Sequence, residues 1–105
     1  MGPPPLATKA FDRAARALAD RRRCEIVEML AAYGELPCNE ICRRLPVTQA
    51  TVSHHLKELS AAGLLTSRRV GQFCFYQVDE RFVQRYLFEL QSRLLPPKRR
   101  RSRAA

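Results

Sequence analysis

The sequence predicts a small, mainly α-helical domain with one β-hairpin. Three observations lead to this fold class. Apolar residues recur at helical spacing through most of the chain before Gly63, the period changes to that of strands after it, and helical spacing returns after Val78. A length of 105 residues fits one domain, and a hydrophobic fraction of 46% excludes a fully disordered chain.

Two helices are expected in the first third of the chain. Residues 1–6 contain three consecutive prolines and are expected to form a flexible lead. Apolar spacing predicts a first helix over residues 7–19. Asp20 is a good N-cap for a second helix over Arg21–Tyr33, because its short side chain can accept hydrogen bonds from the first turn. Gly34 then ends this second helix.

Two further helices are joined by a tight turn. A short helix is expected over about Cys38–Arg44, with Pro37 at its start, where a missing N–H costs nothing. Pro46 ends this helix in a tight turn, and Thr48 then caps a fourth helix over about Gln49–Ala62. The fourth helix has a single apolar stripe, so its other faces are free. The stripe consists of Val52, Leu56 and Leu59.

The β-hairpin comes next. Strands are predicted over Leu64–Val70 and Phe73–Val78, which are rich in β-branched and aromatic residues and are joined by a turn at Gly71. A last helix is expected over about Glu80–Leu94. The predicted order is therefore four helices, two strands and a helix, with no internal repeat.

The positive charge is concentrated at the end of the chain. The formal net charge is +9, and five of these charges fall in residues 96–105, which contain no acid. We expect this segment to be a disordered basic tail after a folded domain over residues 7–95. The tail either binds phosphates without sequence preference or only aids solubility. A chain this basic favours a polyanionic partner, with nucleic acid first.

Helices at a tight turn followed by a hairpin with basic residues are the plan of a winged helix-turn-helix. In that fold the fourth helix enters a DNA major groove. The residues that lie away from its apolar stripe can hydrogen-bond base edges or phosphates. We call them the reading face: Thr48, Gln49, Thr51, Ser53, His54 and Lys57. The alternative is that they are only the solvated side of an amphipathic helix.

The hairpin supplies a second set of candidate contacts. Arg68 and Arg69 lie on its first strand, and Gln72 lies at its tip. Arginines in this position can bind phosphates or enter a minor groove. The alternative is that these charges only protect a strand edge from aggregation.

The run TQATVSHHLKELSAAGLLTSRRVGQFCFYQV over residues 48–78 is a fairly specific motif. Together with the Arg-rich helix before it and the aromatic helix after it, it resembles the ArsR/SmtB family of winged-helix repressors. The resemblance covers about Phe11–Leu94. It implies a homodimer formed by the first and last helices, binding double-stranded DNA at an inverted-repeat operator and repressing transcription.

A dimer also fits the sequence by itself. The apolar stripe of the last helix is too long to be covered by so small a core, and the first helix offers a similar surface. The residues expected at the dimer interface are Phe11, Leu18, Phe82, Val83, Tyr86, Leu87, Leu90 and Leu94.

Two sensor sites that the family resemblance implies are absent from this sequence. The Cys-x-Cys motif at the start of the third helix is missing, because the aligned positions hold Pro37 and Asn39. A site of carboxylates and histidines across the two last helices is also missing, because the predicted last helix has no histidine.

Four cysteines remain as candidates for sensing. Cys38 and Cys42 are four residues apart and share a helix face, where they can bind a thiophilic metal or arsenite as inducer, or react with an oxidant. The alternative is that they are small buried apolar side chains, as we expect for Cys24 and Cys74. No cofactor is otherwise indicated.

Several function classes are excluded. The chain has no phosphate-binding Gly-rich loop, no nucleophile elbow and no HExxH pair, so an enzyme with a substrate is not expected. No apolar run approaches the roughly 20 residues of a membrane span, and no secretory signal opens the chain, which favours the cytoplasm. Two other functions stay open, a non-specific architectural DNA-binding protein and a winged-helix module that binds another protein.

Overall fold

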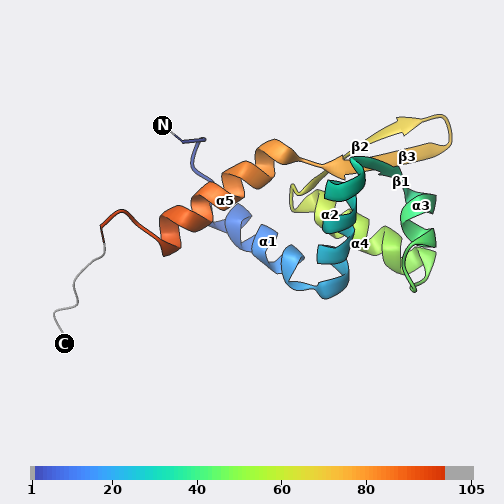
Figure 1. Cartoon of the computed structure of the whole chain (residues 1–105), viewed down its shortest axis with the longest axis horizontal. Coiled ribbons are helices and arrows are strands. Elements are labelled where there is room, and N and C mark those ends of the chain that lie inside the picture. The colour runs from blue at the N-terminus through green and yellow to red at the C-terminus, as the bar shows by residue number, and fades with distance from the viewer. Residues whose placement is uncertain (1, 99–105) are drawn as a thin grey trace.

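The computed structural model describes residues 2–98 and confirms the mainly helical winged helix-turn-helix, with one strand more than expected (Figure 1). The elements in chain order are α1 (Thr8–Ala19), α2 (Arg21–Tyr33), β1 (Glu35–Pro37), α3 (Cys38–Arg43), α4 (Gln49–Ala61), β2 (Leu65–Val70), β3 (Phe73–Val78) and α5 (Glu80–Leu94).

The core lies between α2, α3, α4 and the base of the hairpin. The apolar stripe predicted for α4 is fully buried there, with Val52, Leu56 and Leu59 at most 1% exposed. Ile26 of α2 and Ile41 of α3 face it and are also inaccessible to solvent. Burial of one such side chain stabilises the fold by roughly 1.5–3 kcal/mol, so this cluster fixes the orientation of α4.

Three side-chain caps hold the helix starts. Asp20 accepts a hydrogen bond from the Arg23 amide at 3.0 Å, as predicted. Thr48 accepts one from the Thr51 amide at 3.2 Å, and Asp79 accepts one from the Phe82 amide at 3.1 Å. Because each cap satisfies an amide that the helix cannot pair, α2, α4 and α5 begin where the sequence predicts.

The sheet has three antiparallel strands in the order β1-β3-β2, where the sequence predicted only a two-stranded hairpin. β1 was missed because three residues are too few to show strand alternation. Its Pro37 is allowed at this position because β1 is an edge strand, where no N–H is needed on the outer side. Leu36 lies opposite Tyr76, and Pro37 lies opposite Phe75. β1 therefore ties the start of α3 to the middle of the wing.

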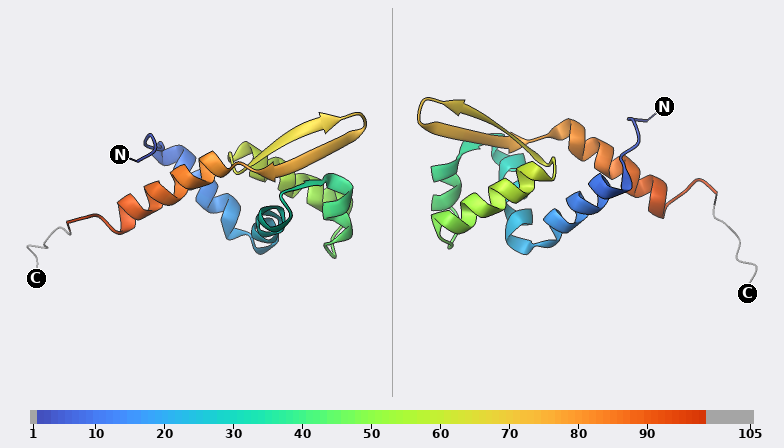
Figure 2. Two further views of the ribbon diagram at one scale, coloured as in Figure 1. Left: turned by 45° about the horizontal axis from the view of Figure 1, so that its top comes forward. Right: turned by 180° about the vertical axis from the view of Figure 1, so that it is seen from behind.

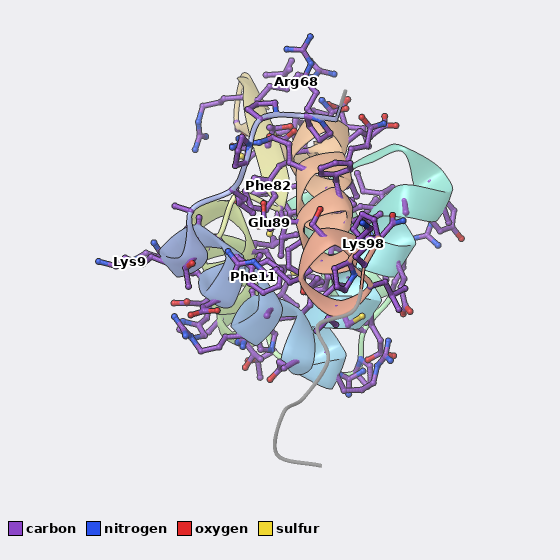
Figure 3. The ribbon with its side chains drawn as sticks, turned by 90° about the vertical axis from the view of Figure 1, so that its left-hand side faces the viewer. Lys9, Phe11, Arg68, Phe82, Glu89 and Lys98 are labelled. Carbon is purple, nitrogen blue, oxygen red and sulfur yellow. The ribbon has the colours of Figure 1, made fainter. Side chains whose placement is uncertain are left out.

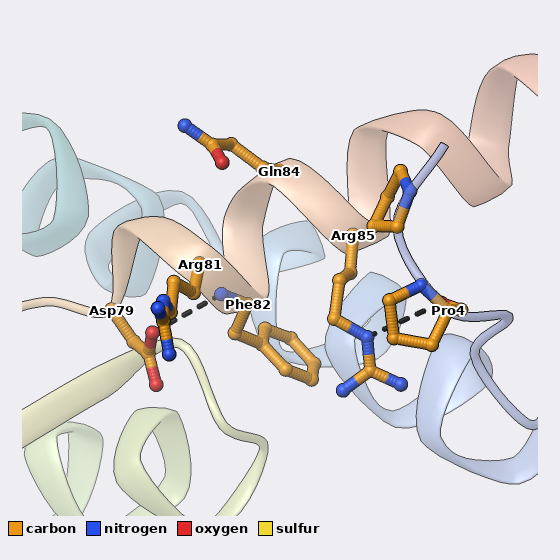
Figure 4. A pocket seen from close by; sticks show the side chains of 7 residues that line it. Pro4, Asp79, Arg81, Phe82, Gln84 and Arg85 are labelled. Carbon is orange, nitrogen blue, oxygen red and sulfur yellow. Dashed lines mark hydrogen bonds between the residues drawn. The ribbon is translucent and has the colours of Figure 1, made fainter. Parts of the chain in front are cut away.

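The segment before α1 differs from the flexible lead that was expected. Leu6 is buried, and its amide donates a hydrogen bond to the Glu89 carboxylate of α5 at 3.0 Å. The Arg85 guanidinium donates to the Pro4 carbonyl oxygen at 3.4 Å, and a cavity of about 510 Å³ lies beside this contact (Figure 4). The proline segment thus lies along α5. Of the expected basic tail, residues 99–105 fall outside the described part of the chain.

The last helix extends away from the winged core. Figures 1 and 2 show α5 projecting to one end, with α1 beside it, while the hairpin tip points to the other end. The described chain measures 59 × 28 × 23 Å, and α5 has no fully buried residue. None of its helices is long and apolar enough to cross a membrane.

Candidate nucleic-acid interface

The reading face lies on the solvent side of α4. All six of its residues are exposed, whereas the stripe on the opposite side is buried. The two adjacent histidines divide between these environments. His54 is exposed, and His55 is half-buried with its Nδ1 atom out of contact with solvent. The geometry thus presents a continuous polar face that is rigidly backed by the core.

The wing tip lies near the start of α4. Gln49, the first residue of α4, and Gln72, in the hairpin turn, line the same cavity of about 330 Å³. Both side chains are exposed, and Figure 1 shows the hairpin tip and α3 at the end of the molecule opposite α5. The structure therefore brings together the two elements that the sequence predicted as separate candidate contacts.

The two wing arginines have different surroundings. The Arg68 guanidinium forms two hydrogen bonds of 2.8 Å with the Glu35 carboxylate, reaching across β3 from β2 to β1. It also lies 5.0 Å from the centre of the Phe75 ring. This pairing lowers the pKa of Glu35 and raises that of Arg68. Arg69 is exposed and forms no ion pair with any residue in the described range 2–98.

Arg68 is predicted to be a wing contact to DNA, and the structure adds that its guanidinium already binds a carboxylate in a bidentate pair. This pair joins the two outer strands of the wing to each other. No local pattern in the sequence indicates this pairing, because the two residues are 33 positions apart and β1 was not predicted. Glu35 is the site residue that sequence reasoning missed.

The candidate thiols lie beneath this interface. Cys38 and Cys42 of α3 are half-buried and pack against the core. Burial, with a contribution from the neighbouring Cys38 thiol, raises the pKa of Cys42. Cys24 and Cys74, expected in the core, are also half-buried. All four are free thiols in the structure.

The residues expected at a dimer interface fall into two groups. Three of them pack against the core of the same protomer: Leu18, Phe82 and Val83. Phe11 of α1 stacks on Tyr86 of α5, with ring centres 5.3 Å apart, and Figure 3 views α1 and α5 from this end. Leu87 and Leu94 remain 55% and 69% exposed. Beside them lie Phe88 and Leu95, which the sequence analysis overlooked, at 43% and 66% exposed.

Comparisons with known proteins agree with this geometry. The model of a helix-turn-helix domain family matches residues 18–68. An HTH-type transcriptional regulator of Mycobacterium tuberculosis is 48% identical over 68 residues, which are 65% of this chain and 63% of that protein. The chain therefore spans less than two thirds of the length of this curated relative.

A second relative decides the family. The arsenical resistance operon repressor of Bacillus subtilis is 31% identical over 81 residues, which are 77% of each chain. The chain belongs to the ArsR family. Both of these relatives are transcriptional regulators rather than enzymes.

A solved structure extends the likeness to the fold. It is the homodimeric winged helix-turn-helix DNA-binding domain of a possible ArsR-family regulator from Mycobacterium bovis. Its TM-score with this ArsR-family chain is 0.66 at 25% identity, and the match covers 90% of this chain and 89% of that one.

Proposed function

We propose that this ArsR-family chain is a homodimeric transcriptional repressor that binds an inverted-repeat operator in double-stranded DNA. Each protomer places the reading face of α4 in a major groove and the wing along the neighbouring backbone. Two-fold symmetry then requires half-sites about 34 Å apart, or a multiple of that distance. The proposal places this activity in the cytoplasm.

The observation that carries the proposal is the exposed polar face of α4. Gln49 can bond an adenine through two atoms, and the hydroxyls and Lys57 can bond bases or phosphates. The N-terminal amides of α4 favour phosphate as well. Arg69 adds a free cation on the wing, within the part of the chain that the structure describes. The exposed face of α4 thus offers groups that can bond base edges, and the wing offers a cation that can bind phosphate.

The homodimer rests on the uncovered side of α5. Leu87, Phe88 and Leu94 expose apolar surface on α5, whose start packs against the core and which also contacts α1 and the proline segment. Large exposed apolar patches on small proteins mark contact surfaces. The related Mycobacterium bovis domain is a homodimer. We therefore propose that α5, with α1, pairs two protomers and sets the spacing of the two reading faces.

The proposal also includes an inducer that acts on thiols. Cys38 and Cys42 are free, half-buried thiols, and Cys38 lines a cavity together with Gln49, so a thiophilic metal, arsenite or an oxidant that reacts with them can shift the reading face. A related Bacillus subtilis protein is a repressor of an arsenical resistance operon. The operator complex, once prepared, can be challenged with each agent in the wild type and in Cys38→Ser and Cys42→Ser.

The direct test is selection of duplex DNA by the purified full chain, followed by affinity measurements at about 150 mM salt. We expect an inverted-repeat sequence to be enriched and to bind at least about 1,000-fold more tightly than random duplex. Deletion of residues 97–105 should lower affinity for both duplexes but keep the preference. Binding without preference, lost on this deletion, would show an architectural protein instead. No affinity for any duplex would favour a protein-interaction module.

A further inference from the structure

We propose that Cys38 and Cys74 form a disulfide when the protein meets hydrogen peroxide, and that this bond shifts the wing relative to α4. The pair lies outside the Cys-x-Cys positions of the family motif, which hold Pro37 and Asn39 here. The inference that the disulfide forms depends only on the positions of the two thiols. Its effect on DNA binding rests on the function proposed above.

The register of the sheet ends one residue short of these two cysteines. β1 and β3 are antiparallel, with Leu36 opposite Tyr76 and Pro37 opposite Phe75. Cys38 and Cys74 each lie one residue beyond the Pro37–Phe75 pair, at the point where the chain turns from β1 into α3. The last paired residues of antiparallel strands have Cα atoms about 4.5–5.5 Å apart, so residues one step beyond them start close to the range of about 4.4–6.8 Å for disulfides.

A cavity gives both thiols a shared and accessible space. Cys38 and Cys74 line the same cavity of about 330 Å³, and both are half-buried. Both also lie close enough to the Tyr76 hydroxyl to affect it. Burial together with Cys74 and Cys38 raises the pKa of Tyr76 to about 12. A small oxidant can therefore reach two thiols that already lie near each other.

Cys42 is a poorer partner for Cys38. Residues four apart on a helix have Cβ atoms about 5–6 Å apart, whereas a disulfide requires about 3.5–4.5 Å. Burial also raises the pKa of Cys42, which reduces its thiolate fraction. In the described residues no three His, Cys, Asp or Glu side chains are placed to hold a metal ion together. Two-thiol chemistry between α3 and β3 is therefore favoured over a preformed metal site.

The reaction is balanced with peroxide as the oxidant. The thiolate of one cysteine attacks a peroxide oxygen, the O–O bond breaks, and a sulfenic acid and hydroxide form. The thiolate of the second cysteine then attacks the sulfenic sulfur, the S–S bond forms, and the S–O bond breaks with release of hydroxide. The two thiol protons convert both hydroxides to water. Two thiols are oxidised, and one peroxide is reduced to two waters.

The new bond acts on the candidate interface because the same cavity is lined by Gln49 and Gln72. Joining the sulfurs draws β3 towards α3 and closes this space. The wing tip then moves relative to the first residue of the reading helix. We expect operator affinity to fall at least about fivefold, the lower end of typical coupling between sites, and to recover with dithiothreitol.

Peptide mapping of the full chain tests the disulfide without DNA. The reduced protein is treated with hydrogen peroxide, remaining thiols are alkylated, and the chain is cut with trypsin and a glutamate-specific protease. Cys38 then lies in the peptide 36–40, Cys42 in 41–43 and Cys74 in 70–80. We expect loss of two of the four free thiols and a cross-link between peptides 36–40 and 70–80.

Serine variants provide the matched controls. Cys42→Ser and Cys24→Ser should keep the cross-link, whereas Cys38→Ser and Cys74→Ser should abolish it while unfolding at a temperature close to that of the wild type. A cross-link between Cys38 and Cys42, or only sulfinic and sulfonic acids at these positions, would overturn the proposal.

Operator binding forms the second arm of the test. Peroxide should weaken binding by the wild type but leave binding by Cys74→Ser unchanged. Cross-linked protein that binds as tightly as reduced protein would overturn the proposed shift of the wing. A reduced protein that binds no duplex would instead contradict the proposed function, and the peptide map would still decide whether the disulfide forms.

Discussion

At the residue scale, the wing is organised by one ion pair between distant residues. Arg68 spans β3 to reach Glu35 with two bonds of 2.8 Å, and its guanidinium lies over Phe75. Both charged side chains keep contact with solvent, so the pair contributes little stability on its own. Its effect is geometric, because it fixes the edge strand β1 to the outer strand β2. The adjacent Arg69 has no ion-pair partner among residues 2–98 and is the wing residue that we propose contacts phosphate.

This difference predicts opposite effects of two substitutions on salt dependence. Arg69→Ala should weaken binding to all sequences about equally and lower the slope of log affinity against log salt by about 1. Glu35→Gln removes the charge that neutralises Arg68 and should raise the slope by up to about 1. Fluorescence anisotropy between 50 and 300 mM salt measures both slopes. At about 100 mM salt, charges more than roughly 10 Å apart are already screened, so the slopes report close contacts.

Lys9→Ala serves as the matched control for Arg69→Ala. Lys9 is exposed on α1 and lies well apart from Arg68 in Figure 3. Its removal should leave the slope unchanged. Equal slopes for Arg69→Ala and Lys9→Ala would contradict the assignment of the wing as a phosphate contact.

A second residue-scale prediction concerns Glu89 and pH. Hydrogen bonds from the Leu6 amide and from Arg93 lower the pKa of the Glu89 carboxyl in the folded protein. A lowered folded pKa adds stability above the unfolded value of about 4.3, and this stability is lost as the pH falls through the folded pKa. Glu89→Gln should therefore lower the melting temperature at pH 7 but not at about pH 3. A difference that persisted at pH 3 would show that the charge of Glu89 has no role.

At the element scale, helix ends were easier to predict from the sequence than strand partners. Asp20 and Thr48 cap α2 and α4 through side chains that bond within three residues, so the signal is local. β1 could not be predicted, because its three residues become a strand only through pairing with β3, some forty positions later. The Glu35–Arg68 pair depends on β1 and was missed for the same reason. Helix propensity and capping depend on neighbouring residues, whereas strand pairing depends on residues far apart in the sequence.

The junction between α4 and β2 provides a prediction on stability. Gly63 has a φ of +90°, and a Cβ built on it would lie 2.9 Å from Cε1 of Phe82 in α5. Gly34 has nearly the same φ, +89°, but has open space around it. Both alanine variants incur the strain of a left-handed backbone, about 1–2 kcal/mol. Gly63→Ala must also displace an aromatic ring, which costs about 1–3 kcal/mol more.

Thermal or urea unfolding measures this difference directly. Gly63→Ala should lower the free energy of unfolding by at least about 1 kcal/mol more than Gly34→Ala, or roughly 4–8 °C in melting temperature for a domain of this size. Equal losses would mean that Phe82 does not pack against Gly63 as the structure places it.

At the scale of the whole molecule, the apolar end of α5 is the surface that a single protomer does not cover. The sequence predicted that the last helix carries more apolar surface than the core can cover, and the structure leaves Leu87 and Leu94 largely exposed. The sequence could not predict which apolar residues of α5 the protomer itself would bury. Phe82 and Val83 pack against the core instead, because the turn at Asp79 brings the start of α5 onto it.

The proposed dimer makes a prediction on assembly. Leu94→Glu places a charge in the apolar patch and should convert a dimer into a monomer, because an unpaired charge at an interface is costly. Tyr33→Glu is the control, since Tyr33 is 57% exposed but lies at the end of α2. Sedimentation velocity should show dimers for the wild type and Tyr33→Glu and monomers for Leu94→Glu. A dimer that survives Leu94→Glu would place the interface elsewhere.

The central claim is that the exposed face of α4 reads DNA sequence, and one measurement tests it most directly. The ratio of affinities for the selected operator and for a scrambled duplex is compared among the wild type, Gln49→Ala and Lys9→Ala at one salt concentration. We predict that Gln49→Ala lowers this ratio by the equivalent of about 1–3 kcal/mol, while Lys9→Ala leaves it unchanged. An unchanged ratio for Gln49→Ala, in a protein that still prefers its operator, would contradict the claim.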